Sequence, residues 1–291
     1  SVALFGASDR ADSVGGVVFK NLITSGYKGR IYAINPKRDE VQGQKAYPSL
    51  DEIEEPVDLV VVATPASSIP AIVEACGERG IKMMLILSAG FRETGDAGRR
   101  LEDRVTELAR RHGIRLMGPN CLGIIRPDIG LNITFGNNSA QPGNLALVSQ
   151  SGAICTAILD WAEANDIVFS AVVSTGIAAD LDFIFQVIDA ARPCIEHDLP
   201  AEQPSRLGLP VHGGPERVHL VVEFAGRLAA GAGRTAADGE DLARRFRGDD
   251  LVLGALEDAS YRTLFEVQRA AIAAGAPSLF LTLDPDGVRI G

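Results

Sequence analysis

Short apolar runs alternate with segments of helical spacing along the first part of the chain. Between the runs, apolar residues recur every three or four positions in Val17–Ile23, Ile69–Arg79 and Leu101–Arg111, which predicts helices. Apolar strands that alternate with helices predict an α/β fold with a parallel sheet covered on both faces. The carboxyl ends of such strands lie at one edge of the sheet, where ligands bind. The runs predicted as strands are Val2–Ala7, Arg30–Asn35, Val57–Thr64, Met83–Ser88 and Ile114–Gly118.

The periodicity lapses from Arg126 to Asn144, in a stretch rich in Gly, Pro and Asn. We therefore expect a first domain over residues 1–127, a linker over 128–143 and a second domain over 144–291. The second domain begins as another α/β unit, with a helix at Ala153–Asn165, a further helix from about Asp180, and strands at Leu145–Ser149 and Ile167–Ser174.

Beyond Phe183 the pattern weakens, and the segment that follows contains several prolines and little periodicity. Further strands are predicted at Val218–Phe224, Leu251–Leu256 and Leu279–Leu283, and a helix at Tyr261–Ala274.

Composition excludes several classes of protein. A formal net charge of −10 argues against a nucleic-acid surface, because phosphate backbones bind clustered Lys and Arg. The four cysteines have no CxxC spacing, which indicates reduced intracellular thiols and neither a disulfide framework nor a metal site. No apolar run reaches the roughly 20 residues that span a bilayer, so no membrane contact and a cytoplasmic location are expected. The start at Ser1, within a strand-like run, suggests a fragment.

The first strand ends in a glycine, Gly6, and a helix opens with Ser13-Val14-Gly15-Gly16. A glycine at this turn lets the backbone approach a ligand, and free N–H groups at the helix N-terminus can bind a phosphate. The motif is not GxGxxG, however, so an ordinary Rossmann-like turn is the alternative.

The second strand ends in Asn35-Pro36-Lys37-Arg38. An NAD-binding domain usually carries Asp or Glu near this point to hold the ribose hydroxyls. Two cations here favour a ligand with a phosphate on its ribose, either CoA or NADP. A solvated turn is the alternative.

Three further loops follow predicted strands: Ala63-Thr64-Pro65-Ala66, Ser88-Ala89-Gly90-Phe91 and Gly118-Pro119-Asn120-Cys121-Leu122-Gly123. Small residues, hydroxyls and backbone amides at the carboxyl edge suit a long, thin ligand that carries phosphates. Together these loops predict one extended binding site.

The motifs GASDR…SVGG, INPK, VVVATPAS, LSAGF, GPNCLGI and LVSQSGA resemble the NDP-forming acyl-CoA synthetases, relatives of the succinyl-CoA synthetase α subunit. The same domains occur in a related set of protein acetyltransferases. The resemblance covers Ser1 to about Phe183. It implies a Rossmann-like CoA-binding domain followed by a flavodoxin-like, succinyl-CoA-ligase-type domain.

The resemblance also assigns residues to the ligand. It places Gly6, Ser8 and Val14 at the nucleotide end of CoA and Asn35, Pro36 and Lys37 at its phosphate. It places Thr64, Pro65 and Ala66 beside the adenosine and pyrophosphate. The pantetheine arm would follow Ser88, Ala89, Gly90, Phe91, Asn120 and Cys121. In the second domain, a phosphoryl group or acyl phosphate would occupy the anion hole formed by Ser149, Gln150, Ser151, Gly152 and Ala153.

The chain departs from the family pattern in the second domain. Ile177 replaces an Asn after a glycine, and none of the four histidines has the context of the family's phosphohistidine. His212, between Val211 and two glycines, is the candidate phosphohistidine whose context comes nearest to that of the family. The region is a divergent domain, a domain of the acetyltransferase branch, or a reading-frame artefact.

The family reaction converts acid, CoA and ATP to acyl-CoA, ADP and phosphate through an acyl phosphate. ATP or ADP with Mg would enter only through an ATP-grasp subunit or fused domain, which this sequence does not resemble. Two alternatives stay open: a regulatory module that senses CoA or acyl-CoA, joined to an acetyltransferase domain, and an NADP-dependent oxidoreductase domain.

Overall fold

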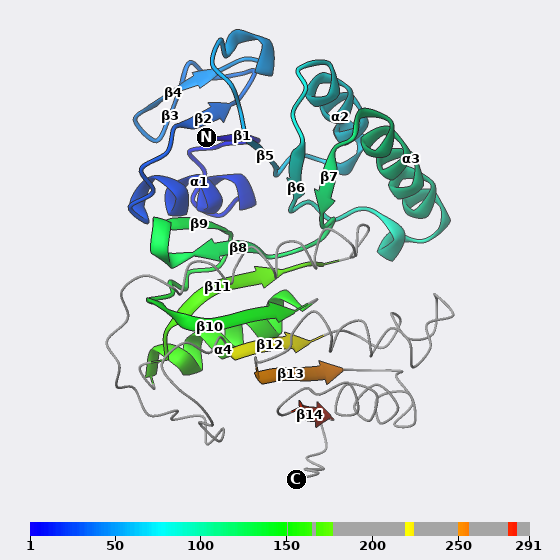
Figure 1. Ribbon diagram of the computed structural model, residues 1–291. Helices are drawn as coiled ribbons and strands as arrows, with labels where there is room; N and C mark the ends of the chain where they lie inside the picture. Colours follow the sequence, from blue (N-terminus) through cyan, green and yellow to red (C-terminus); the bar gives the residue numbers. More distant parts are fainter. Residues whose placement is uncertain (150, 165–166, 177–218, 224–249, 256–278, 284–291) are drawn as a thin grey trace. The chain divides into compact units, whose positions relative to one another are not determined.

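The computed structural model describes residues 1–149, 151–164, 167–176, 219–223, 250–255 and 279–283 (Figure 1). They form two compact units. The first contains Ser1–Ser139 and residues 173–176, and the second contains Ala140–Val172 and the three last strands.

The first unit is built on a seven-stranded sheet in the order β3-β4-β2-β1-β5-β6-β7. All neighbours from β4 to β7 are parallel, whereas β3 and β4 form an antiparallel hairpin. Numbered along the chain, the parallel strands have the 3-2-1-4-5-6 order of dinucleotide-binding folds. The strands are β1 (Val2–Phe5), β2 (Ile31–Ile34), β3 (Glu40–Val41), β4 (Gln44–Tyr47), β5 (Leu59–Val62), β6 (Met83–Ile86) and β7 (Arg115–Met117).

Three α-helices and three short 3₁₀ turns connect these strands. The helices α2 and α3 pack against each other (Figure 1). The helix α3 ends at Gly113, whose left-handed φ of 65° suits a C-terminal glycine. The helices are α1 (Val14–Thr24), α2 (Ile69–Glu78) and α3 (Asp96–His112), and the turns are η1 (Leu50–Glu52), η2 (Ala66–Ser68) and η3 (Arg92–Thr94).

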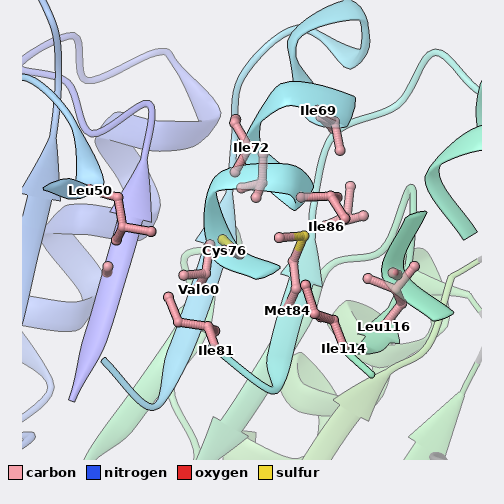
Figure 2. Packing of buried hydrophobic residues seen from close by; sticks show 14 of the residues in the cluster. Leu50, Val60, Ile69, Ile72, Cys76, Ile81, Met84, Ile86, Ile114 and Leu116 are labelled. Atoms are coloured by element: carbon pink, nitrogen blue, oxygen red, sulfur yellow. The ribbon is translucent and has the colours of Figure 1, made fainter. Parts of the chain in front are cut away.

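Alternate residues of the central strands form the core beneath α2 (Figure 2). Val60 and Val62 of β5 and Met84 and Ile86 of β6 pack against the apolar stripe of α2. This stripe consists of Ile69, Ile72, Val73 and Cys76. The three- and four-residue spacing seen in the sequence is therefore the spacing of a buried helix face.

An antiparallel hairpin follows β7, formed by β8 (Gly123–Arg126), the turn η4 (Pro127–Ile129) and β9 (Leu131–Thr134). It is held to α1 by Asn21, whose Nδ2 donates to the carbonyl oxygens of Thr134 and Gly136 at 2.8 and 2.9 Å. Part of the stretch predicted as a structureless connection is therefore strand. The exact domain limits, including 128–143 as a linker, stay a prediction.

The second unit contains β10 (Pro142–Ser149), α4 (Gly152–Ala164), β11 (Phe169–Ser174), β12 (His219–Glu223), β13 (Asp250–Ala255) and β14 (Leu279–Leu283). The strands follow the order β14-β13-β12-β10-β11. Numbered along this unit, that is the flavodoxin-like order 2-1-3-4-5. The sequence prediction of a Rossmann-like domain followed by a flavodoxin-like domain is thus confirmed.

No helix among the described residues is long and apolar enough to cross a membrane. The same residues contain no cluster of three or more His, Cys, Asp or Glu side chains that could hold a metal ion. The predicted helix Tyr261–Ala274 and the helix from about Asp180 lie outside the described residues.

Candidate functional site

The carboxyl ends of β1, β2 and β5 lie side by side in the first unit. Phe5 is in register with Ile34 on one side and with Val62 on the other. The residues that follow stay bonded: Gly6 N donates to Ile34 O at 3.1 Å, and Ala63 N donates to Phe5 O at 2.9 Å. The strand order reverses between β1 and β5, and crevices at such switch points bind ligands.

The segment from Gly6 to Gly16, called here the nucleotide loop, contains two glycines at which a side chain would be strained or would clash with backbone. Gly6 has φ of 91°, and a Cβ on Gly15 would lie 1.9 Å from the carbonyl oxygen of Gly6. Ser13 caps α1, because its Oγ accepts from Gly16 N at 3.1 Å. Next to the cap, Val14 is 40% exposed, unlike the buried apolar residues of α1. Gly15 therefore allows α1 to pack closely against the end of β1, and Val14 is the apolar side chain that this segment exposes.

The turn after β2 uses its polar side chains in two different ways. Asn35 Nδ2 donates to Ala7 O at 2.8 Å, while its Oδ1 accepts from Lys37 N at 2.9 Å. Arg38 pairs with Asp9 at 3.8 Å. Pro36 and Lys37 are exposed. Of the residues predicted here, Asn35 orders the turn, and Lys37 presents a cation at the surface.

The loops after β5 and β6 are joined by hydroxyl groups. Ser88 Oγ donates to Thr64 O at 2.6 Å, and Thr64 Oγ1 and Ser68 Oγ share a hydrogen bond of 2.8 Å. A Cβ on Gly90 would meet the Cβ of Ala66 at 3.0 Å. Thr64, Ala66, Ser88 and Gly90 thus lie together, as the sequence predicted, and Pro65 and Ala89 are exposed beside them.

Two amides of the loop after β6 are hydrogen-bonded to a carboxylate of the same loop. Glu93 Oε1 accepts from Gly90 N at 2.6 Å and from Phe91 N at 3.2 Å. Burial raises the pKa of Glu93, but these backbone N–H groups and the charge of Arg92 outweigh burial and hold the pKa below its usual value. Phe91 is fully buried in the core, and its place beside the pantetheine arm stays a prediction.

A second carboxylate supports the same loop. Glu102 of α3 has a side chain that is 3% exposed, and it forms an ion pair with Arg92. Its Oε2 also accepts from Arg92 N at 3.3 Å. A buried charge is tolerated only when it is paired and hydrogen-bonded, as Glu102 is.

The loop after β7 reaches the same edge, because Asn120 N donates to Ser88 O at 3.0 Å. Asn120 has φ of 55° and is exposed. Cys121 is buried, and its Sγ donates to Ile86 O at 3.4 Å. The Cys121 side chain therefore belongs to the core, and Asn120 is the exposed residue of this pair.

In the second unit, Ser151 caps α4. Its Oγ accepts from Ile154 N at 3.3 Å, and Ser149 Oγ accepts from Ser151 N at 3.0 Å. Gly152 and Ala153 form the first turn of the helix. The strand–loop–helix turn predicted around Ser149–Ala153 is present, whereas Gln150, Ile177 and His212 lie outside the described residues.

Sequence reasoning missed Gln42, which lies in the turn between β3 and β4. Its backbone N donates to Asp9 Oδ1, and its Nε2 donates to Ser8 O and to Gly16 O, each at 2.8 Å. The dipeptide Gln42-Gly43 was the only available signal for a hairpin turn, and Gln is uncommon in such turns.

Two family models match the chain, one in each of the two domains and in the same order along the sequence. Residues 1–127 match a CoA binding domain, and residues 142–190 match a succinyl-CoA ligase like flavodoxin domain. The chain is thus similar to the NDP-forming acyl-CoA synthetases. The similarity is to their CoA-binding α portion.

Curated relatives in this family match the first part of the chain. The chain is 43% identical over 186 residues to subunit alpha of ADP-forming acetate–CoA ligase I from Pyrococcus furiosus, covering 62% of this chain and 40% of that subunit. It is 44% identical over 181 residues to an ADP-forming acetate–CoA ligase from Methanocaldococcus jannaschii, covering 62% of this chain and 25% of the relative. The chain thus spans well under half the length of these relatives.

Solved structures extend the similarity of fold over 98% of the chain. PH0766 from Pyrococcus horikoshii has a TM-score of 0.74, 31% identity and 57% of its own chain covered. Acetyl-coenzyme A synthetase 1 of Ca. Korarchaeum cryptofilum, in complex with phosphate and ADP, has a TM-score of 0.73, 26% identity and 58% covered.

Proposed function

We propose that the first unit binds CoA at the carboxyl edge of its sheet, as the CoA-handling portion of an NDP-forming acyl-CoA synthetase. One observation carries this proposal. At the switch point of a 3-2-1-4-5-6 sheet, the turn after β2 presents Lys37 instead of the acid that would hold the ribose of NAD. The cation suits the ribose phosphate of CoA.

Residues along the carboxyl edge of the sheet support this proposal. The nucleotide loop offers glycine backbone and the exposed Val14 to the adenosine end. Thr64 and Ser88 continue the edge, and Asn120 follows. The path from Lys37 to Asn120 would carry the ligand from its ribose phosphate to its pantetheine arm.

The reaction proposed for the assembled enzyme converts an acid, CoA and ATP to acyl-CoA, ADP and phosphate. In its CoA-dependent step, the CoA sulfur attacks the carbonyl carbon of an acyl phosphate, the C–O bond to phosphate breaks, and the thiol proton is lost. The turn Ser149–Ala153 is the proposed site for the phosphoryl group, because N–H groups at a helix N-terminus stabilise anions.

The partners of the chain follow from the same proposal. The relatives named here are ADP-forming ligases, so an ATP-grasp subunit or domain would hold ATP or ADP with Mg. The proposed compartment is the cytoplasm. The comparisons do not favour the NADP-dependent oxidoreductase or the regulatory module.

Isothermal titration of the chain with CoA, dephospho-CoA, NADP and NAD tests the binding proposal. We expect CoA to bind most tightly and dephospho-CoA more weakly. Tighter binding of NADP, or no binding of CoA, would overturn the proposal. Release of phosphate from acetyl phosphate and CoA, in the presence of an ATP-grasp subunit of a relative, tests the catalytic step separately.

A further inference from the structure

The hairpin of β3 and β4 has an unusual residue at its tip. Gln42 and Gly43 form the two-residue turn, with φ of 48° and 76°. Positive φ is favourable for Gly and tolerated by Asn, but it is uncommon for a long side chain such as Gln. A Gln is therefore not explained by the turn itself.

The side-chain amide nitrogen of Gln42 binds the nucleotide loop. Its Nε2 donates one hydrogen bond to the carbonyl oxygen of Ser8 and one to that of Gly16, both at 2.8 Å. Its backbone N donates to Asp9 Oδ1, also at 2.8 Å. Gln42 is thus hydrogen-bonded to Ser8 and Asp9 in the first part of the loop and to Gly16 in the first turn of α1.

The hairpin that carries Gln42 is itself anchored. Val41 is fully buried, and β4 pairs in parallel with β2 through Ala33 and Ala46. The turn is thus fixed to the sheet, so that Gln42 can hold the nucleotide loop in place.

The contacts have an electrostatic consequence for an anionic ligand. Carbonyl oxygens carry partial negative charge and repel phosphate, whereas N–H groups attract it. Asn35 Nδ2 binds the carbonyl of Ala7, and Gln42 Nε2 binds the carbonyl of Ser8. Two successive carbonyls of the loop are thereby bonded to amides of the protein.

We infer that Gln42 is a positioning residue for CoA: it holds the Gly6–Gly16 loop in the conformation that accepts the nucleotide end of the ligand. This inference rests on the proposed function. The residues that determine the affinity for CoA would then include one on the β3–β4 hairpin. This hairpin is not one of the loops that form the candidate site.

The variants Gln42→Asn and Gln42→Gly test this role, because both residues tolerate positive φ and both keep the backbone N–H that binds Asp9. Neither can reach the two carbonyls. We expect the Kd of CoA and of dephospho-CoA to rise about tenfold, since two hydrogen bonds that order the loop are lost. The thermal midpoint should change little, because relief of the positive φ at position 42 offsets the loss of the hydrogen bonds. Gln44→Asn, at an exposed position of the same hairpin, is the matched control and should bind CoA normally.

Each other result overturns the inference in a recognisable way. If Gln42→Asn binds CoA as tightly as the wild type, the positioning role is wrong and the CoA site stands. If affinity falls only together with the thermal midpoint, Gln42 supports folding and not the loop. If the wild type itself does not bind CoA, both this inference and the proposed function are wrong.

Discussion

Gly6 packs directly against Ala63: a Cβ atom on Gly6 would lie 2.7 Å from the carbonyl oxygen of Ala63. The same Cβ would lie 3.1 Å from the Thr64 methyl group. The ends of β1 and β5 can approach this closely only with glycine at position 6. The contact lies at the point where the strand order reverses, so it fixes the width of the proposed binding crevice.

Substitution of Gly6 should therefore weaken CoA binding by more than backbone strain explains. Gly26 has a similar φ of 89°, but a Cβ there would have no atom within 4 Å. Gly6→Ala and Gly26→Ala should each lower the free energy of unfolding by roughly 1–2 kcal/mol, because both place a Cβ on a residue with positive φ. Only Gly6→Ala should also lose CoA affinity in isothermal titration. Equal CoA affinity in the two variants would show that the ligand lies elsewhere.

Lys37 should determine the preference for CoA over dephospho-CoA. Loss of one charge-assisted contact to a phosphate costs about 1.5–3 kcal/mol, so Lys37→Ala should bind the two ligands with similar affinity. Lys45→Ala removes the same charge from a side chain that lies over the Tyr47 ring, and it is the control. A Lys37→Ala variant that still prefers CoA would contradict the assignment.

The sequence predicts the fold well because hydrophobic periodicity is a local signal, and the alternation of strands with helices along the chain indicates a parallel sheet. The predicted strands at Val2–Ala7 and Met83–Ser88 contain β1 and β6, and Leu279–Leu283 coincides with β14. The hairpins were missed for physical reasons. β3 has two residues, too few for alternation to be visible, and β9 lies among Gly, Pro and Asn residues that are typical of loops.

The candidate site was predicted less completely than the fold. The convergence of Gly6, Thr64 and Ser88 follows from parallel topology, and the structure shows it. The orientation of Asn35 and the burial of Phe91 depend on tertiary packing, which a linear motif does not encode. Whether these residues bind CoA stays a prediction that the experiments above test.

Glu93 should make the loop after β6 sensitive to acid. The pKa of Glu93 is lowered in the folded protein, so its stabilising contribution is present above the unfolded pKa of about 4.3. This contribution is lost as the pH falls through the lower, folded pKa. Thermal midpoints measured from neutral pH to pH 3 should fall less steeply in Glu93→Gln than in the wild type. Glu78→Gln, at an exposed position of α2, should follow the wild-type curve; an unchanged curve for Glu93→Gln would contradict this role.

Cys76 should be inert toward thiol reagents in the native protein. Burial beneath α2 raises the pKa of its thiol to about 12, and only the thiolate is reactive. Iodoacetamide at pH 8, followed by peptide mass spectrometry, should label Cys76 only after denaturation in urea. Rapid labelling of the native chain would show that the core under α2 opens readily.

The strand order has a consequence for the exchange of amide hydrogens with solvent. β1 has neighbours on both sides, and its Ala3 and Leu4 are fully buried, so its amides should exchange only through global unfolding. The β3–β4 hairpin lies at the edge of the sheet, where local opening costs least. Each opening of that edge would separate Gln42 from the carbonyls of Ser8 and Gly16. Occupation of the crevice should therefore slow exchange in the hairpin, at amides that the ligand does not touch.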